Sequence, residues 1–66
     1  MSVAKVIEIS ADSTKSFEDA IADGIKRATE SVHNVRSARV QEQQVIVENG
    51  KISSFRVNLK VTFVLD

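Results

Sequence analysis

The sequence contains no cysteine and a single histidine, His33, which excludes disulfide bonds, thiolate metal sites and zinc fingers. It also lacks tryptophan, tyrosine and proline, and it has only two glycines among its 66 residues. A chain of this length buries only about 60% of the surface of its unfolded state, and such domains usually need disulfides, a metal or self-association. Self-association is therefore the support that we expect.

Charge of either sign is not in excess, because nine lysines and arginines balance nine aspartates and glutamates. This balance argues against a general binder of nucleic acids or membrane surfaces. No apolar run approaches the ~20 residues of a membrane-spanning helix, and the opening "MSVAKVIEIS" lacks the long apolar core of a signal peptide. We expect a cytoplasmic protein with neither a nucleic acid nor a membrane as partner.

The first half of the chain predicts a strand followed by a helix. Residues 3–10 are short and rich in β-branched side chains, which is typical of a strand, and 11–16 form a polar turn. Apolar residues then recur at helical spacing over 16–32, with Ser16 as the N-cap. Gly24 lies on the apolar stripe of this helix, where a residue without a side chain indicates that the helix crosses close to a sheet.

The second half of the chain predicts a long hairpin. Residues 35–48 have strand character, but their alternation changes phase, which indicates a β-bulge near 41–44. Asn49-Gly50 is a strong signal for a two-residue hairpin turn. Residues 52–65 alternate almost perfectly, with apolar side chains at odd positions and mainly polar ones at even positions. Each arm would have about 14 residues, well beyond the usual strand length.

These elements predict a single α+β domain, residues 1–66, in the order β-α-β-β. One helix can cover only one face of a three-stranded sheet, so we expect it to pack on the odd side of the last strand. The other face and the strand edges stay open, and long exposed edges promote association unless they are covered. We expect other copies of the chain to cover them.

No set of catalytic residues can be named. The single imidazole, His33, has no identifiable partner in the sequence and is interpreted as a complement to the helix dipole. Arg56, Asn58 and Lys60, on the even side of the last strand, form either a solvated face or, in an assembly, part of a shared pocket. Glu42 is either a solvated charge or a ligand for a hard cation, because a symmetric oligomer multiplies one carboxylate around its axis.

Several stretches resemble the dodecin family: "KVIEIS", Ser13 within "ADSTKSFEDAI", "IKRATESV", "ARV" and "FRVNLKVTFVLD". The resemblance covers nearly the whole chain and agrees with the β-α-β-β order. It implies a three-stranded antiparallel sheet wrapped around one helix, assembled as a hollow homododecamer. It also implies a binding protein that stores or sequesters flavins held in pairs between subunits, and not an enzyme.

The flavin-contacting residues of that family are replaced in this sequence. By alignment, the positions of the stacking tryptophan, the glutamine at the isoalloxazine edge and two phosphate-anchoring arginines hold Ser37, Arg56, Gln44 and Val64 respectively. A serine offers no aromatic face against which a flavin ring can stack. We therefore expect weak or absent binding of FMN or riboflavin.

The stretch "VRSARVQEQ", together with "FRVNLKV", is similar to a tryptophan-lacking branch, the calcium dodecins. This similarity implies a dodecamer with bound Ca²⁺ and leaves the calcium ligands open. The resulting hypothesis is a homododecameric binding or storage protein without a flavin-stacking site, which binds a divalent cation or another small ligand at subunit interfaces. The alternatives are a functional flavin-sequestering protein and a purely structural oligomeric module.

Overall fold

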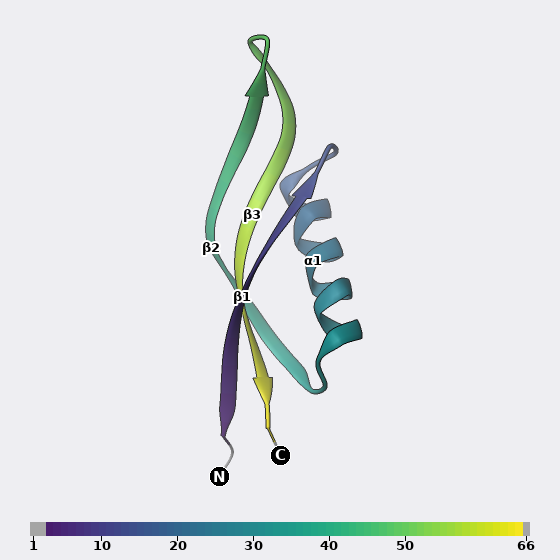
Figure 1. Ribbon diagram of the computed structural model, residues 1–66, viewed down its shortest axis with the longest axis vertical. Coiled ribbons are helices and arrows are strands. Elements are labelled where there is room, and N and C mark those ends of the chain that lie inside the picture. Colours follow the sequence, from purple (N-terminus) through teal and green to yellow (C-terminus); the bar gives the residue numbers. More distant parts are fainter. Residues whose placement is uncertain (1–2, 66) are drawn as a thin grey trace.

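The computed structural model describes residues 3–65 and has the predicted element order (Figure 1). The elements are β1 (Ala4–Ser13), α1 (Phe17–Ser31), β2 (Val35–Glu48) and β3 (Lys51–Val64). The helix and the two hairpin strands lie within one residue of their predicted ends. The predicted fold class, α+β with a three-stranded antiparallel sheet and one helix, is confirmed.

The sheet has the strand order β1-β3-β2, so the last strand lies in the middle. β3 runs antiparallel to both neighbours, and β1 and β2 therefore run in the same direction on either side of it. Within the described chain, the free edges belong to β1 and β2. The hairpin thus leaves one long edge open, since the other is covered by β1.

The core lies between α1 and the middle strand, as the alternation in the sequence predicts. The odd-numbered side chains Val57, Leu59 and Val61 of β3 are completely buried. They pack against Ala20 and Ala28 of the helix. Among the described residues, only five apolar side chains are buried, and the residues that surround them are only partly covered, so the core provides limited hydrophobic stabilisation.

Gly24 lies where the helix comes closest to the sheet. A Cβ atom at this position would lie 3.1 Å from Cδ1 of Leu59 and 3.2 Å from Cβ of Ala11. Both distances are shorter than ordinary van der Waals contact, so a side chain here would require Leu59 and Ala11 to shift by a few tenths of an ångström. The predicted close crossing is confirmed.

The first strand is longer than predicted, and the expectation of a polar turn was wrong for residues 11–13. Ala11 and Asp12 continue the ladder opposite Val57 and Arg56 of β3. Ala11 also lies under Gly24 of the helix. Pairing with a distant strand and contact with the helix therefore override the polar character of this segment, which local patterning alone cannot reveal.

Ser13 and Ser16 hold the connection from β1 into α1. The hydroxyl of the buried Ser13 donates to Oδ2 of Asp19 (2.7 Å) and accepts from the backbone N–H of Lys15 (2.9 Å). Ser16 Oγ accepts from the backbone N–H of Asp19 (2.9 Å), which confirms the predicted N-cap. The start of the helix is thus fixed relative to the end of β1.

The hairpin has the predicted turn and the predicted bulge. Asn49 and Gly50 have φ values of 53° and 75°, which is the conformation of a type I′ turn. The ladder passes from the pair Val40–Leu59 to the pair Glu42–Asn58, so one residue of β2 bulges between them. Two further irregularities, at 35–37 of β2 and opposite 46–47, were not predicted.

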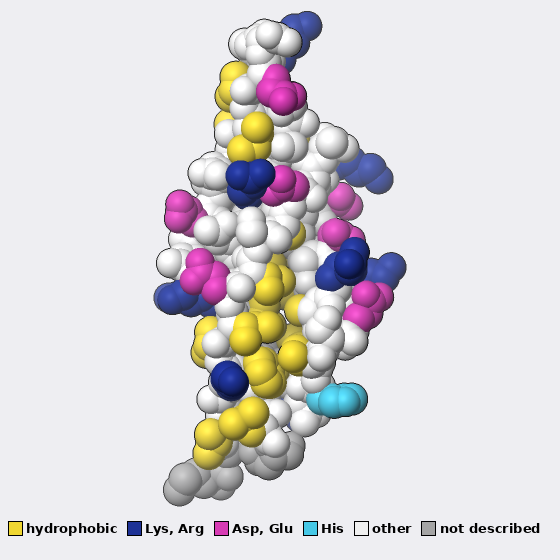
Figure 2. Space-filling model, in the orientation of Figure 1, with side chains coloured by type: hydrophobic (Ala, Val, Ile, Leu, Met, Phe, Trp, Pro, Cys, Tyr) yellow, Lys and Arg dark blue, Asp and Glu magenta, His cyan; other side chains and the backbone are white. Residues whose placement is uncertain are grey.

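The hairpin extends beyond the end of the helix and leaves apolar side chains uncovered (Figures 1 and 2). The molecule measures 50 × 19 × 14 Å, and its radius of gyration is 13.5 Å, compared with about 11 Å for a compact chain of this length. Its accessible surface is 4825 Å², compared with about 4,200 Å² for a typical folded monomer of this mass. The exposed large apolar residues are Val3, Val6, Val40, Val45, Val47, Ile52 and Leu65.

Candidate functional site

The face of the sheet that points away from α1 is the candidate site, and we call it the open face. It consists of the even-numbered side chains of β3 and of the residues that lie directly opposite them in β1 and β2. Four rows cross it: Asp12–Arg56–Gln44, Ser10–Asn58–Glu42, Glu8–Lys60–Arg39 and Val6–Thr62–Ser37. Eleven of these twelve side chains are charged, amide or hydroxyl groups, so the face can bind a polar or charged ligand.

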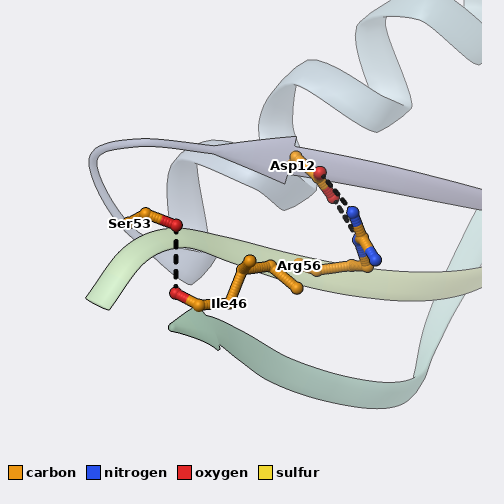
Figure 3. A network of polar contacts seen from close by, with 4 residues as sticks. All are labelled: Asp12, Ile46, Ser53 and Arg56. Atoms are coloured by element: carbon orange, nitrogen blue, oxygen red, sulfur yellow. Dashed lines mark hydrogen bonds and ion pairs between the residues drawn. The ribbon is translucent and has the colours of Figure 1, made fainter. Parts of the chain in front are cut away.

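The first row contains a bidentate ion pair between β1 and β3 (Figure 3). Arg56 donates from Nε to Oδ1 of Asp12 (2.7 Å) and from Nη2 to Oδ2 (2.9 Å). These hydrogen bonds lower the pKa of Asp12 and raise the pKa of Arg56 from their ordinary values, while desolvation opposes both shifts. The fork of Arg56 is therefore engaged by its own chain, and Gln44 lies across from it on β2.

The second row offers oxygen atoms to a hard cation. Glu42 lies opposite Asn58, and Asn58 lies opposite Ser10, so a carboxylate, an amide and a hydroxyl cross the sheet together. Ca²⁺ takes six to eight oxygen ligands at 2.3–2.6 Å. Within residues 3–65, no three acidic or histidine side chains lie close enough to form a metal-binding group. One copy of the chain therefore supplies only part of a calcium shell.

The third and fourth rows border a hollow in the surface. It is lined by Val6, Ser37, Ala38, Arg39, Lys60 and Thr62. Ser37, which the sequence resemblance aligned with the stacking tryptophan, therefore lies in a hollow whose open-face side chains are two cations, two hydroxyl groups and Val6. It contains no aromatic ring.

All five predicted site residues lie on the open face, but only some of them lie together. Gln44 and Arg56 are directly opposite, and Glu42 is one row away. Ser37 faces Thr62, six residues along β3 from Arg56, or about 20 Å at the rise of an extended strand. Val64, opposite Ala4, lies two residues further on. A ligand that touched all of these positions would need more than one copy of the chain.

A second hollow, which no sequence pattern indicates, lies between the free edge of β1 and the helix. Ile7, Ile9 and Ala11 form one wall, and Gly24 and Ala28 form the other. Asp12, Asp23 and Arg27 lie at its border. The glycine and alanine of the helix stripe have little side-chain volume with which to fill this space.

His33 does not form a catalytic arrangement. It follows the helix, which ends at Ser31, rather than lying in its last turn as expected. The side chain is exposed, and among residues 3–65 no hydrogen bond joins it to a carboxylate or hydroxyl group. A histidine general base needs such a positioned partner.

A family model for dodecin matches residues 3–66 of the sequence. The chain belongs to the dodecin family. Among curated dodecins, the calcium dodecin of Mycobacterium tuberculosis is 43% identical over 63 residues, which are 96% of this chain and 89% of the relative. The resemblance that the sequence motifs indicated is confirmed.

Solved dodecin structures have the same fold. The dodecin of Streptomyces davaonensis superposes with a TM-score of 0.93 at 32% identity, over 98% of this chain and 96% of that one. The M. tuberculosis calcium dodecin, whose structure is described as having a novel calcium-binding site, superposes with a TM-score of 0.86 at 40% identity, over 98% and 93% of the two chains. Within residues 3–65, no helix of this dodecin is long and apolar enough to span a membrane.

Proposed function

We propose that this dodecin is a non-enzymatic, homododecameric binding or storage protein that binds Ca²⁺ at subunit interfaces and has lost the flavin-stacking site. The observation that carries the proposal is the composition of the open face. Its four rows offer oxygen ligands and charged groups, but none of their twelve residues, Ser37 included, has an aromatic ring.

Self-assembly is supported by the apolar side chains that the helix does not reach. Val40 on β2, Val45 and Val47 near the hairpin end, and Ile52 on β3 remain 39–58% exposed. β2 also presents a long free edge, since β3 covers only its other side. Exposed apolar strands with open edges require a partner, and a second copy of the chain is the partner that is always available.

Loss of flavin binding is supported by the side chains at two positions of the open face, 37 and 56. Ser37 presents a small hydroxyl group, and a flavin ring would lose its stacking surface there. Arg56 is held by Asp12 in a bidentate ion pair. A flavin edge that approached this position would have to compete with a carboxylate for the guanidinium donors.

Calcium binding is supported by the similarity to the M. tuberculosis calcium dodecin and by the second row of the open face. The M. tuberculosis protein is a calcium dodecin, and its structure is described as containing a calcium-binding site. In this chain Glu42 supplies a carboxylate next to the side-chain oxygen of Asn58. Two or more copies around a symmetry axis would bring several such sets together, which satisfies the preference of Ca²⁺ for many oxygen ligands. A cytoplasmic location stays a prediction.

The test is calorimetric titration of the assembled protein with CaCl₂, for the unmodified chain and for Glu42→Gln and Glu48→Gln. Glu48 lies at the hairpin end opposite Lys51 and serves as a control for the loss of one carboxylate. We expect heat of binding for the unmodified chain and Glu48→Gln, and its loss in Glu42→Gln. Absence of heat at millimolar calcium would exclude the calcium proposal, and unchanged binding by Glu42→Gln would exclude Glu42 as a ligand.

Flavin binding is tested separately by the fluorescence of riboflavin and FMN titrated with the protein. We expect little or no quenching, since flavin binding should be weak or absent. Yellow protein on purification, or strong quenching, would instead establish the flavin-sequestering alternative. If neither calcium nor flavin changes the thermal stability of the assembly, the structural-module alternative is favoured, because a ligand that binds only the native state must raise its stability.

A further inference from the structure

The hollow around Ser37 has an unusual arrangement of charge. Arg39 of β2 and Lys60 of β3 are directly opposite each other, so their side chains leave the sheet on the same face at neighbouring positions. Like charges in this arrangement destabilise a sheet. Glu8, opposite Lys60 on the other side, is the only carboxylate in this row. The row therefore carries an excess of positive charge.

Neither of these cations is paired in the part of the chain that the structure describes. Arg56 on the same face is bound by Asp12, and Arg27 on the helix contacts Glu30. No ion pair or hydrogen bond within residues 3–65 engages the side chains of Arg39 or Lys60. Their donors are thus available to a ligand.

Two hydroxyl groups complete the hollow. The bulge at the start of β2 places Ser37 opposite Thr62, one row from the two cations. Both side chains line the same hollow as Arg39 and Lys60, and neither hydroxyl is hydrogen-bonded to another described residue. A guanidinium, an ammonium and two hydroxyl groups are the donors that proteins use for phosphate oxygens.

From this arrangement we propose that the hollow binds a phosphate group, with Arg39 and Lys60 neutralising its charge and Ser37 and Thr62 donating hydrogen bonds. Val6 lies beside these donors on the open face and provides an apolar wall for an organic substituent, so a phosphate monoester fits the site better than the free ion. The site is separate from Gln44 and Val64, and it requires neither calcium nor a second copy of the chain.

The test is calorimetric titration with inorganic phosphate, with phenyl phosphate and with phenol, in a buffer without other oxyanions. We expect both phosphates to bind, phenyl phosphate more tightly, and phenol not to bind. Binding of inorganic phosphate alone would show that the wall does not contribute and would overturn the monoester part of the proposal. No binding of either at about 10 mM, ten times a dissociation constant of about 1 mM, would overturn it entirely.

Paired variants identify the residues. Arg39→Gln/Lys60→Gln removes both cations of the hollow, and Lys26→Gln/Lys51→Gln removes two exposed lysines from the helix and the hairpin end. We expect the first pair to weaken phosphate binding by roughly tenfold or more, since each charge-assisted hydrogen bond is strong, and the second pair to leave it within about twofold. Equal weakening by both pairs would show only a general effect of net charge and would refute the site.

The mass of the particle, measured for each variant, separates this proposal from the proposed function. A dodecamer that binds calcium but not phosphate refutes the phosphate site alone. If the chain does not assemble but binds phosphate through Arg39 and Lys60, the proposed assembly is refuted and the phosphate site is supported.

Discussion

Val47 and Ile52 lie opposite each other near the hairpin end, beyond the reach of the helix, and they are 58% and 57% exposed. Complete burial of a valine or isoleucine side chain is worth about 1.5–3 kcal/mol, so covering the exposed part of each would contribute roughly 0.9–1.7 kcal/mol. Together they would contribute about 2–3 kcal/mol per copy to an assembly that covers them. Removing that contribution weakens association on the order of 100-fold, at 1.4 kcal/mol for each factor of ten.

The variant Val47→Asp/Ile52→Asp removes this apolar contact and places two carboxylates in it, which adds the cost of burying unpaired charge. We expect the particle to dissociate into smaller species at concentrations at which the unmodified protein is fully assembled. Thr14→Asp, in the exposed turn before the helix, adds a carboxylate at a position without an apolar neighbour to lose and should not change the mass. Sedimentation velocity over a dilution series gives the mass, and circular dichroism reports the remaining sheet. A double variant that keeps the full mass at every concentration would refute the role of the hairpin end in assembly.

Three further predictions concern the sheet itself. Gly24→Ala should lower the free energy of unfolding in urea by up to about 2 kcal/mol. Overpacking against Ala11 costs about 1–3 kcal/mol, and the higher helix propensity of alanine offsets only about 1 kcal/mol of this cost. A variant more stable than the unmodified protein would show that the neighbouring side chains can shift to make room. Ser37→Trp/Arg56→Gln should quench riboflavin fluorescence on binding, whereas Ser37→Trp alone should quench it less, and equal failure of both would show that the alignment of these positions is wrong. Because the hydrogen bonds from Arg56 lower the pKa of Asp12, the ion pair stabilises the fold at pH values above the ordinary aspartate pKa of 3.8. This stabilisation is lost as the pH falls through the lower pKa of the folded state. The acid unfolding curve of Asp12→Asn should therefore lack this component, and a curve identical to that of the unmodified protein would contradict the prediction.

The fold could be predicted from the sequence because its local signals agree with one another. The alternation of the last strand matches the burial of its odd side chains, Asn49-Gly50 adopts the turn that its residue types favour, and Gly24 lies at the crossing of helix and sheet. The phase change of residues 35–48 also marks a real bulge. Each of these features depends on residues close together in the chain, or on a pattern with a fixed period.

The contacts of the open face could not be predicted in the same way. Asp12 and Arg56 are 44 residues apart, and they meet only because β1 pairs with β3 in one register. The segment around Asp12 has the composition of a turn, so sequence patterning ends the strand too early. This register, and not the composition of either strand, determines which charged side chains form ion pairs.

The hollow at Ser37 depends on an irregularity that the sequence does not signal. The first bulge of β2 shifts the ladder so that Ser37 lies opposite Thr62 and Arg39 lies opposite Lys60. If the register of the pair Val35–Phe63 continued without that shift, Ser37 would lie opposite Val61 and Arg39 opposite Leu59, on the helix side of the sheet. The calcium ligands are a different case, because a single copy presents only part of a shell, and no pattern within one chain can describe a site that several copies share.

One copy of this dodecin exposes apolar side chains of its sheet that its helix does not cover, and we propose that the chain is stable only in a shell of copies. Sedimentation velocity of the unmodified protein, diluted to micromolar concentration in a physiological buffer, tests it most directly. We expect a single species with twelve times the chain mass of 7.3 kDa. A folded, soluble particle with the mass of one chain would contradict it.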